Sequence, residues 1–240
     1  MKNYLSFGGG VNSVALHLLM IREGFDFESI FINHGTDWPE TYEYFEYFQN
    51  WLKSNGHKPI TELIPNESGF NNLYDFAYSK AMLPCIYPRW CTSNWKIKHI
   101  NKYVVKPCFM HIGFSSDESK RAKININKGI ENRWLLIEHD IDRDGCKKLI
   151  ESYGLKIPMK SGCYICPFQK KSQFIELRKK HPDLFCKAQQ LEQKNIEYRL
   201  SKGIKPRSLH PSKKLLSELI EENQMQIFEI DEYPPCQCML

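Results

Sequence analysis

The stretch that decides the fold is Asn3-Tyr4-Leu5-Ser6-Phe7-Gly8-Gly9-Gly10-Val11-Asn12-Ser13. Its first five residues are typical of a short strand, and the three glycines are typical of a loop. Apolar positions then recur at helical spacing from Val14 until Gly24, with Asn12 as the expected cap. Glycines let the backbone approach an anion, and the helix that follows directs its positive end at the same place. The stretch therefore predicts a phosphate site after the first strand.

Four further segments have the short apolar runs of buried strands. They are Ser29 to Asn33, Pro59 to Ile64, Cys108 to Gly113 and Trp134 to Glu138. Helical patterns that begin at Pro39, Asn72 and Asn94 separate them. Strands that alternate with helices imply right-handed crossovers. We therefore expect an α/β fold with an open, mostly parallel five-stranded sheet and helices on both faces.

The pattern changes after about Asp140 to helices and cysteine-bearing turns. We expect residues 1–140 to form an adenine nucleotide-binding α/β domain and residues 141–240 to form a helical C-terminal extension with metal-binding cysteines. The extension includes the basic stretch Lys202 to Lys214. A chain of 240 residues is long enough for one such main domain with a smaller appendage.

Composition narrows the class of protein. Hydrophobic residues make up 42% and charged residues 25%, which is typical of a soluble globular chain, and the net charge of +5 suits an anionic partner. The most apolar stretch, Val14 to Ile21, is too short to span a bilayer, so we expect a cytoplasmic protein with no membrane partner. Nine cysteines in such a chain favour metal binding or thiol chemistry over disulfides.

The glycine loop resembles the pyrophosphate-binding loop (PP-loop) of the adenine nucleotide alpha hydrolase superfamily, whose usual form is Ser-Gly-Gly-x-Asp-Ser. Asn12 stands where that form has aspartate. Within the superfamily the chain is most similar to the phosphoadenosine phosphosulfate (PAPS) reductase-like family, and the likeness continues through His34-Gly35-Thr36-Asp37-Trp38-Pro39-Glu40-Thr41. The resemblance implies a Rossmann-like sheet of the HUP type with a nucleotide, and its Mg²⁺, across the strand ends. The nucleotide-binding residues that it implies are Ser6, Gly8, Gly9, Gly10, Asn12, Ser13, Asn33 and Thr41.

Two basic residues are candidates for contact with the reacting group. Lys96 lies in a segment that resembles the family's Cys-x-x-x-x-Lys, although a solvated helix face is the alternative. Arg121 lies in a segment that resembles the family's substrate loop after the fourth strand. The planar guanidinium group of Arg121 can donate two hydrogen bonds to a phosphate or a sulfate. Arg143 is a weaker candidate of the same kind.

The turn Cys163-Tyr164-Ile165-Cys166 is the strongest metal signal, because it brings two thiolates to one ion or cluster. In iron–sulfur members of the family the ligands come from a segment like that of Cys91 and from such a turn. The resemblance thus implies a [4Fe–4S] cluster on Cys91, Cys163 and Cys166, with Cys146 or a tail cysteine, Cys236 or Cys238, as the fourth ligand. A zinc site on Cys163, Cys166, Cys236 and Cys238 is the alternative, and a buried thiol pair is the reading without metal. The other cysteines, Cys85, Cys108 and Cys186, are interpreted as core or incidental residues.

These expectations lead to an enzyme of sulfur chemistry, a PP-loop ATP pyrophosphatase with transferase activity. ATP would be split between its α and β phosphates to activate a substrate for thiolation. Relatives of this type act on nucleic acids, so a nucleic acid and a sulfur donor such as a cysteine desulfurase are the expected partners. One alternative is an adenylyl sulfate or PAPS reductase that releases sulfite, although Pro235-Cys236-Gln237-Cys238 does not match the Glu-Cys-Gly motif of the reductases. Another alternative is a non-catalytic nucleotide-binding scaffold.

Overall fold

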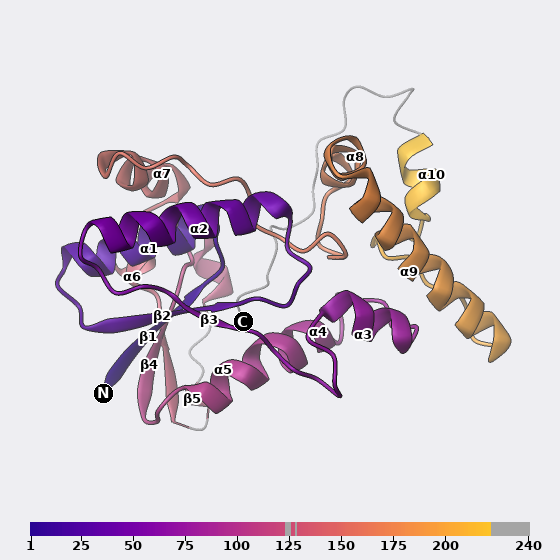
Figure 1. The fold of residues 1–240 in the computed structure, drawn as a ribbon, viewed down its shortest axis with the longest axis horizontal. Helices are drawn as coiled ribbons and strands as arrows, with labels where there is room; N and C mark the ends of the chain where they lie inside the picture. Colours follow the sequence, from indigo (N-terminus) through magenta and orange to yellow (C-terminus); the bar gives the residue numbers. More distant parts are fainter. Residues whose placement is uncertain (123–125, 128, 222–240) are drawn as a thin grey trace.

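The computed structural model describes residues 1–122, 126–127 and 129–221 of the chain. Five parallel strands form an open sheet in the order β3-β2-β1-β4-β6 (Figure 1). Their bounds are β1 Lys2–Phe7, β2 Phe27–Ile32, β3 Thr61–Leu63, β4 Cys108–Ile112 and β6 Ile130–Arg133. The two-residue strand β5, Ile126–Asn127, extends the edge in the antiparallel direction. The predicted open, mostly parallel α/β sheet is confirmed.

The predicted strand over Trp134 to Glu138 is wrong. The fifth parallel strand is β6, and Leu135–Glu138 form the short helix α6 that follows it. A short apolar run fits a buried strand and a buried helix equally well, so its periodicity could not separate them. In β6 only Ile130 is buried, which removes the apolar signal of a strand.

Helices cover both faces of the sheet. Helices α1 (Val11–Arg22), α2 (Pro39–Ser54) and α7 (Arg143–Ser152) share one core with Leu5, Phe7 and Phe31. The other face packs against α5 (Lys98–Tyr103). Helix α1 begins one residue before the expected cap, because Gly10 holds the N-cap position and its carbonyl accepts the backbone N–H of Val14 at 3.0 Å.

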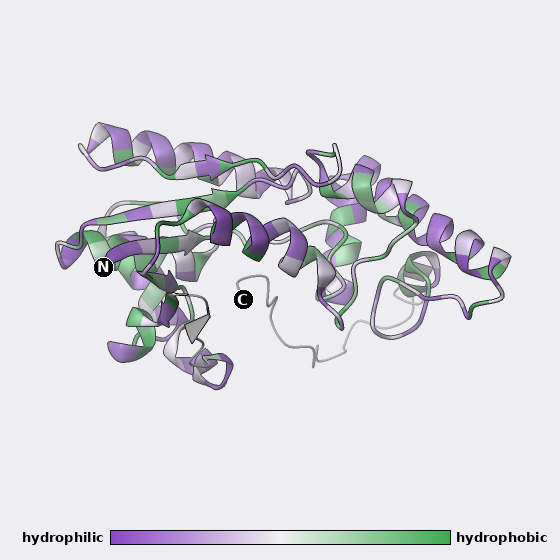
Figure 2. Ribbon diagram, turned by 90° about the horizontal axis from the view of Figure 1, so that it is seen from below, coloured by the Kyte–Doolittle hydropathy of each residue, from purple (hydrophilic) through white to green (hydrophobic). Residues whose placement is uncertain are grey.

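A second core lies beside the sheet, where α8, α9 and α10 gather at one end of the molecule (Figure 1). It contains α3 (Leu73–Ser79), α8 (Lys171–Lys180), α9 (Pro182–Ser201) and α10 (Leu216–Glu221), together with α4 (Trp90–Thr92) and the π-helix η1 (Ser93–Ile97). In Figure 2 the helices at this end carry both green apolar and purple polar residues along their length. Among the described residues, no helix combines the length and the apolar character that crossing a membrane requires.

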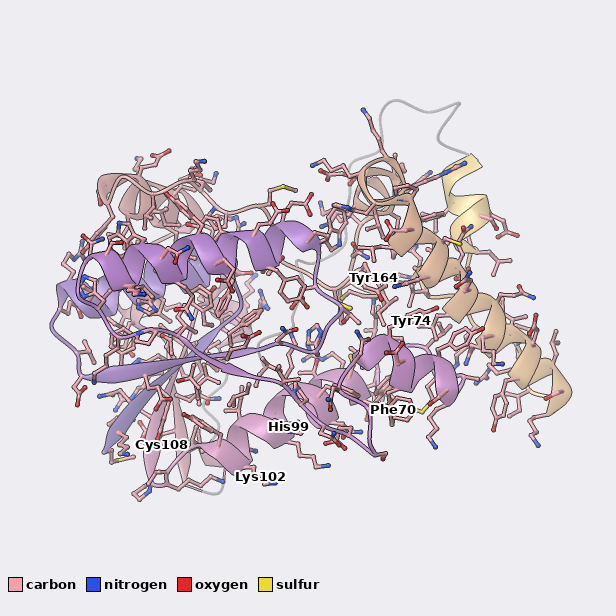
Figure 3. The ribbon with its side chains drawn as sticks, viewed as in Figure 1. Phe70, Tyr74, His99, Lys102, Cys108 and Tyr164 are labelled. Carbon is pink, nitrogen blue, oxygen red and sulfur yellow. The ribbon has the colours of Figure 1, made fainter. Side chains whose placement is uncertain are left out.

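The turn that carries Cys163 and Cys166 belongs to this second core. Tyr164 of the turn lies against Tyr74 of α3, with ring centroids 6.2 Å apart, and the two rings are labelled together in Figure 3. Figure 3 places Cys108 on β4, away from this pair. The two segments that carry the expected metal ligands, the one around Cys91 and this turn, therefore meet outside the sheet.

Two buried histidines make the stability of the fold depend on pH. Burial lowers the pKa of His17 to about 3, with a smaller contribution from His57. Burial also lowers the pKa of His111 to about 4, with a smaller contribution from Arg133. Both values lie below the unfolded value of about 6.5, so the unfolded chain binds more protons between them. The stability that neutral histidine provides is thus complete above about pH 6.5 and is lost as the pH falls.

We predict that the free energy of unfolding decreases by up to about 1.4 kcal/mol per pH unit for each of these histidines below about pH 6. Urea denaturation at several pH values measures the slope. His17→Gln and His111→Gln should each make the dependence shallower, whatever their effect at neutral pH. A slope that neither substitution changes would contradict this assignment.

Candidate functional site

A cavity of about 440 Å³ lies over the carboxyl ends of β1 and β4. In the sheet, β2 is the neighbour of β1 on one side and β4 is its neighbour on the other. Open parallel sheets bind ligands at such a point, because the loops after the two strands diverge there. Residues after β1 line the cavity together with Gly113 and Phe114, which follow β4. From the predicted nucleotide site, Gly8, Gly10, Asn12 and Ser13 line it.

Close backbone approaches fix the glycine loop. Gly9 has a φ of +70°, and a Cβ on it would lie 2.9 Å from the Thr41 methyl group. A Cβ on Gly113 would lie 3.0 Å from backbone atoms of Asn12 and Ser13. The loop can therefore rest on α2 and on the end of β4 only where side chains are missing.

Three other residues of the predicted nucleotide site do not line the cavity. Ser6 is paired within the sheet, opposite Ile30 and Ile112. Thr41 is buried and supports Gly9. Asn33 is occupied by a hydrogen bond to the Glu62 carboxylate at 2.6 Å. Ser6 and Thr41 therefore support the loop, whereas Gly8, Gly10, Asn12 and Ser13 line the cavity.

Asn12 joins the two strand ends through its side chain. Its amide nitrogen donates to the Ser115 hydroxyl at 3.0 Å and to the Glu118 carboxylate at 2.8 Å. Its amide oxygen accepts from the Arg143 guanidinium at 3.2 Å. Glu118 also forms an ion pair with Arg121, whose guanidinium lies 4.4 Å from the Phe114 ring centroid. An aspartate at position 12 would place a second carboxylate against Glu118, so the asparagine suits its neighbours.

Four basic side chains from four separate segments line the cavity. They are Lys96, Arg121, Arg143 and Lys160. Three carboxylates, those of Asp37, Asp117 and Glu118, line it as well. Basic groups around a glycine loop and a helix N-terminus suit a phosphorylated ligand. The carboxylates are ligands of the kind that Mg²⁺ takes from proteins.

A second, much smaller cavity of about 30 Å³ lies beside the first. Four thiols line it, those of Cys85, Cys91, Cys163 and Cys166. Four cysteines are a donor set that fits zinc or a [4Fe–4S] cluster. The volume is that of about one water molecule, and no three described His, Cys, Asp or Glu side chains converge closely enough to hold an ion as they stand. Binding would therefore require the thiols to move, and the thiol of Cys85, on a partly exposed loop, would leave its hydrogen bond to the Pro88 carbonyl at 3.0 Å.

Burial raises the pKa of each of these thiols. The pKa of Cys166 rises to about 12, and that of Cys163 rises well above its ordinary value. For Cys91, burial outweighs the opposing effect of Lys96. Thiolates in this environment need a cation beside them, and a bound metal supplies one.

Backbone hydrogen bonds hold the thiol turn against the segment that follows β2. The N–H of Trp38 donates to the Gly162 carbonyl at 3.0 Å, and the N–H of Tyr164 donates to the Thr36 carbonyl at 2.9 Å. The thiol of Cys163 donates to the Thr36 hydroxyl at 3.0 Å. The turn is therefore fixed to the sheet, although it packs in the helical core.

The two cavities adjoin each other. Lys96 lines both of them. Ser161 and Gly162 line the large cavity, and Cys163, the next residue, lines the small one. The structure thus brings the predicted residues Lys96, Arg121, Cys91, Cys163 and Cys166 to one region.

The remaining cysteines lie elsewhere. Cys146 is buried between α7 and α1 in the core over the sheet, so it is not near Cys163 and Cys166. Cys108 lies in β4, and Cys186 is exposed on α9. The predicted tail ligands Cys236 and Cys238 lie outside the described residues.

Sequence reasoning missed two residues of this region. Cys85 is interpreted from the sequence as a core or incidental cysteine, but it lines the small cavity. Lys160 was not singled out, and its place directly before the cysteine turn was the available signal. Only the fold of the chain shows that both reach the cavities.

Comparison of the sequence with models of known protein families gives no match, and a search of curated proteins gives none either. The resemblance to the PAPS reductase-like family therefore stays a prediction that rests on the motifs of the chain.

We predict that Gly9→Ala weakens adenine nucleotide binding and lowers stability more than Gly24→Ala does. Both glycines have positive φ, +70° and +71°, but only the Cβ at position 9 meets a neighbour within 4 Å. The control variant Gly24→Ala therefore has only the cost of placing a side chain at positive φ, about 1–2 kcal/mol. Calorimetric titration with ATP and thermal unfolding measure the two effects. Equal losses in both variants would show that the contact with Thr41 does not position the loop.

Proposed function

We propose that this protein is an adenine nucleotide-dependent enzyme of sulfur chemistry, with a PP-loop on a Rossmann-like sheet of the HUP type. One observation carries the proposal. A phosphate-type cavity and a four-thiol cavity share the Lys96 side chain as a common wall. Such an arrangement suits a reaction in which ATP first activates an oxygen of the acceptor and a sulfur nucleophile then replaces that oxygen.

The phosphates of ATP would lie over Gly8, Gly10 and Ser13, at the N-terminus of α1. The Ser13 hydroxyl donates to the Gly10 carbonyl at 2.9 Å and so holds the first helical turn, and it would rotate to donate to a phosphate oxygen. Arg121 would exchange its ion pair with Glu118 for the ligand anion, because its planar fork matches phosphate oxygens. Mg²⁺ with the nucleotide would find carboxylate ligands on the same wall.

The reaction that this arrangement supports begins with attack of an acceptor oxygen on the α phosphorus of ATP, from which pyrophosphate leaves. The acceptor becomes adenylated, and a sulfur nucleophile then displaces AMP. Negative charge develops on the phosphate oxygens in the first step. Lys96, which faces both cavities, stands where it can stabilise that charge.

Cys85, Cys91, Cys163 and Cys166 are the residues that would hold a metal centre. We propose a [4Fe–4S] cluster that positions or carries sulfur, and a structural zinc is the alternative. We propose Cys85 as the fourth ligand in place of Cys146 or a tail cysteine, because it lines the same cavity as the other three.

A nucleic acid is the acceptor that the charge distribution favours. Residues 156–219 hold fifteen of the 33 Lys and Arg but only five of the 28 Asp and Glu. Among the five, Glu192 is buried, and its carboxylate accepts the backbone N–H groups of Leu209 and Leu216 at 2.8 and 2.9 Å. The exposed charge of the helical region is therefore strongly positive, as expected for a surface that contacts phosphates.

We predict that the protein releases pyrophosphate from ATP, that added nucleic acid increases the rate, and that Lys96→Ala lowers it at least tenfold, about the effect of removing one charge-stabilising donor. The matched control is Lys98→Ala, because Lys98 is exposed and pairs with Glu67 at 2.7 Å outside the cavities. Coupled detection of pyrophosphate measures the rate.

Sulfite release from an adenylyl sulfate without pyrophosphate release from ATP would replace this proposal with the reductase alternative. Tight nucleotide binding without either product would indicate a scaffold. Equal rates in the Lys96 and Lys98 variants would remove Lys96 from the reaction.

We predict that Cys85→Ser lowers the metal content of anaerobically purified protein and bleaches its broad visible absorption, since a hydroxyl is a poor replacement for a thiolate. Cys146→Ser and Cys186→Ser are the controls and should keep both. Metal analysis and absorption spectra measure the effect.

If the parent protein is colourless and contains about one zinc per chain, and Cys85→Ser loses that zinc, the zinc alternative is correct. If Cys85→Ser keeps its metal and deletion of residues 235–240 removes it, the tail supplies the remaining ligands and Cys85 does not.

A further inference from the structure

One short segment, Lys160 to Cys166, contributes to both cavities. Its first residues, Lys160, Ser161 and Gly162, line the large cavity. Its last residues, Cys163, Ile165 and Cys166, line the four-thiol cavity. No other segment among the described residues supplies consecutive side chains to both.

Ser161 lies directly over the start of α1. A Cβ on Gly10 would be 2.7 Å from the Ser161 hydroxyl oxygen, so this hydroxyl occupies the space above the glycine loop. Gly10 is the N-cap of the twelve-residue helix α1, and the first N–H groups of a helix have no partner within it. A ligand anion that binds these N–H groups would therefore come within reach of Ser161.

Lys160 carries its charge to the rim of the same cavity. Its ammonium donates to the Gln173 side-chain oxygen at 3.1 Å, and Gln173 lies in the first turn of α8. Its backbone is held in place because Gly162, two residues later, is bonded to Trp38. An exposed lysine on an anchored backbone can move its ammonium from the Gln173 amide to an anion with little rearrangement, and the new bond is stronger because it joins two opposite charges.

We propose that Lys160 and Ser161 are phosphate-binding residues, supplied to the nucleotide cavity by the segment that also holds Cys163 and Cys166. The inference rests on the proposed function in that the cavity takes a nucleotide. Ser161 donates its hydroxyl to a phosphate oxygen, and Lys160 neutralises the phosphate chain from the side opposite the glycine loop. The seven-residue segment Lys160 to Cys166 then joins the nucleotide to the thiol centre, so a bound ligand restrains the thiol turn.

The test is calorimetric titration of the full chain with ATP, with tripolyphosphate and with adenosine. Lys160→Ala should weaken ATP and tripolyphosphate binding about tenfold or more, the usual effect of losing a hydrogen bond to a charged group. It should leave adenosine binding unchanged, because adenosine has no phosphate. Ser161→Ala should weaken the same two ligands to a smaller extent, and Lys160→Arg should restore most of the affinity.

The matched control is Lys156→Ala, which removes an equal charge from an exposed lysine on the same connection that lines neither cavity. Thermal unfolding of each variant checks that the fold is retained. Unchanged ATP affinity in Lys160→Ala, or an equal loss in Lys156→Ala, overturns the inference while the proposed function stands. A parent chain that binds neither ATP nor adenylyl sulfate overturns both.

Discussion

The pair of backbone hydrogen bonds between residues 36–38 and 162–164 is the constraint on which the two cavities depend. These bonds join the segment after β2 to the thiol turn, and so they connect the core of the sheet with the helical core. Backbone bonds of this kind are independent of side-chain identity, but the neighbouring residues still shield them. Trp38 is buried beside them, and its indole donates to the Gln169 side chain at 3.0 Å. Without this junction the phosphate cavity would lose one wall and the thiols would lose their support.

The first strand and its glycine loop illustrate what the sequence can predict about this fold. The strand and the helix are recognised from the periodicity of their apolar residues, and the loop between them is recognised from its three glycines. The prediction placed the helix N-terminus near Asn12, and the structure begins it at Val11. The structure has a cavity at the end of β1, where the sequence predicts a phosphate site, but the part that β4 plays in it depends on the strand order, which the sequence does not predict.

Long-range contacts explain the parts that the sequence did not reveal. Cys85 and Cys163 lie 78 positions apart in the sequence, yet they line one cavity. No periodicity or spacing relates them, because the connection runs through the packing of α3 and α4 against the thiol turn. The same holds for the partners of Asn12, which come from Glu118 and Arg143 more than a hundred residues away. The edge strand β6 was missed for a different reason, since partial exposure removed its apolar pattern.

The uneven distribution of charge gives the folded molecule an electric dipole. Outside residues 156–219, the part of the chain that the structure describes holds 16 basic and 19 acidic residues, so the two parts have opposite net charge. A polyanion that approaches such a molecule is turned by long-range forces before any contact forms, and the encounter rate then falls as ionic strength rises. The helices of the second core lie at one end of the molecule (Figure 1). The electric field would therefore orient the molecule so that this basic end meets the polyanion first. The fold therefore sets the direction from which a large anionic partner arrives, separately from the chemistry that follows.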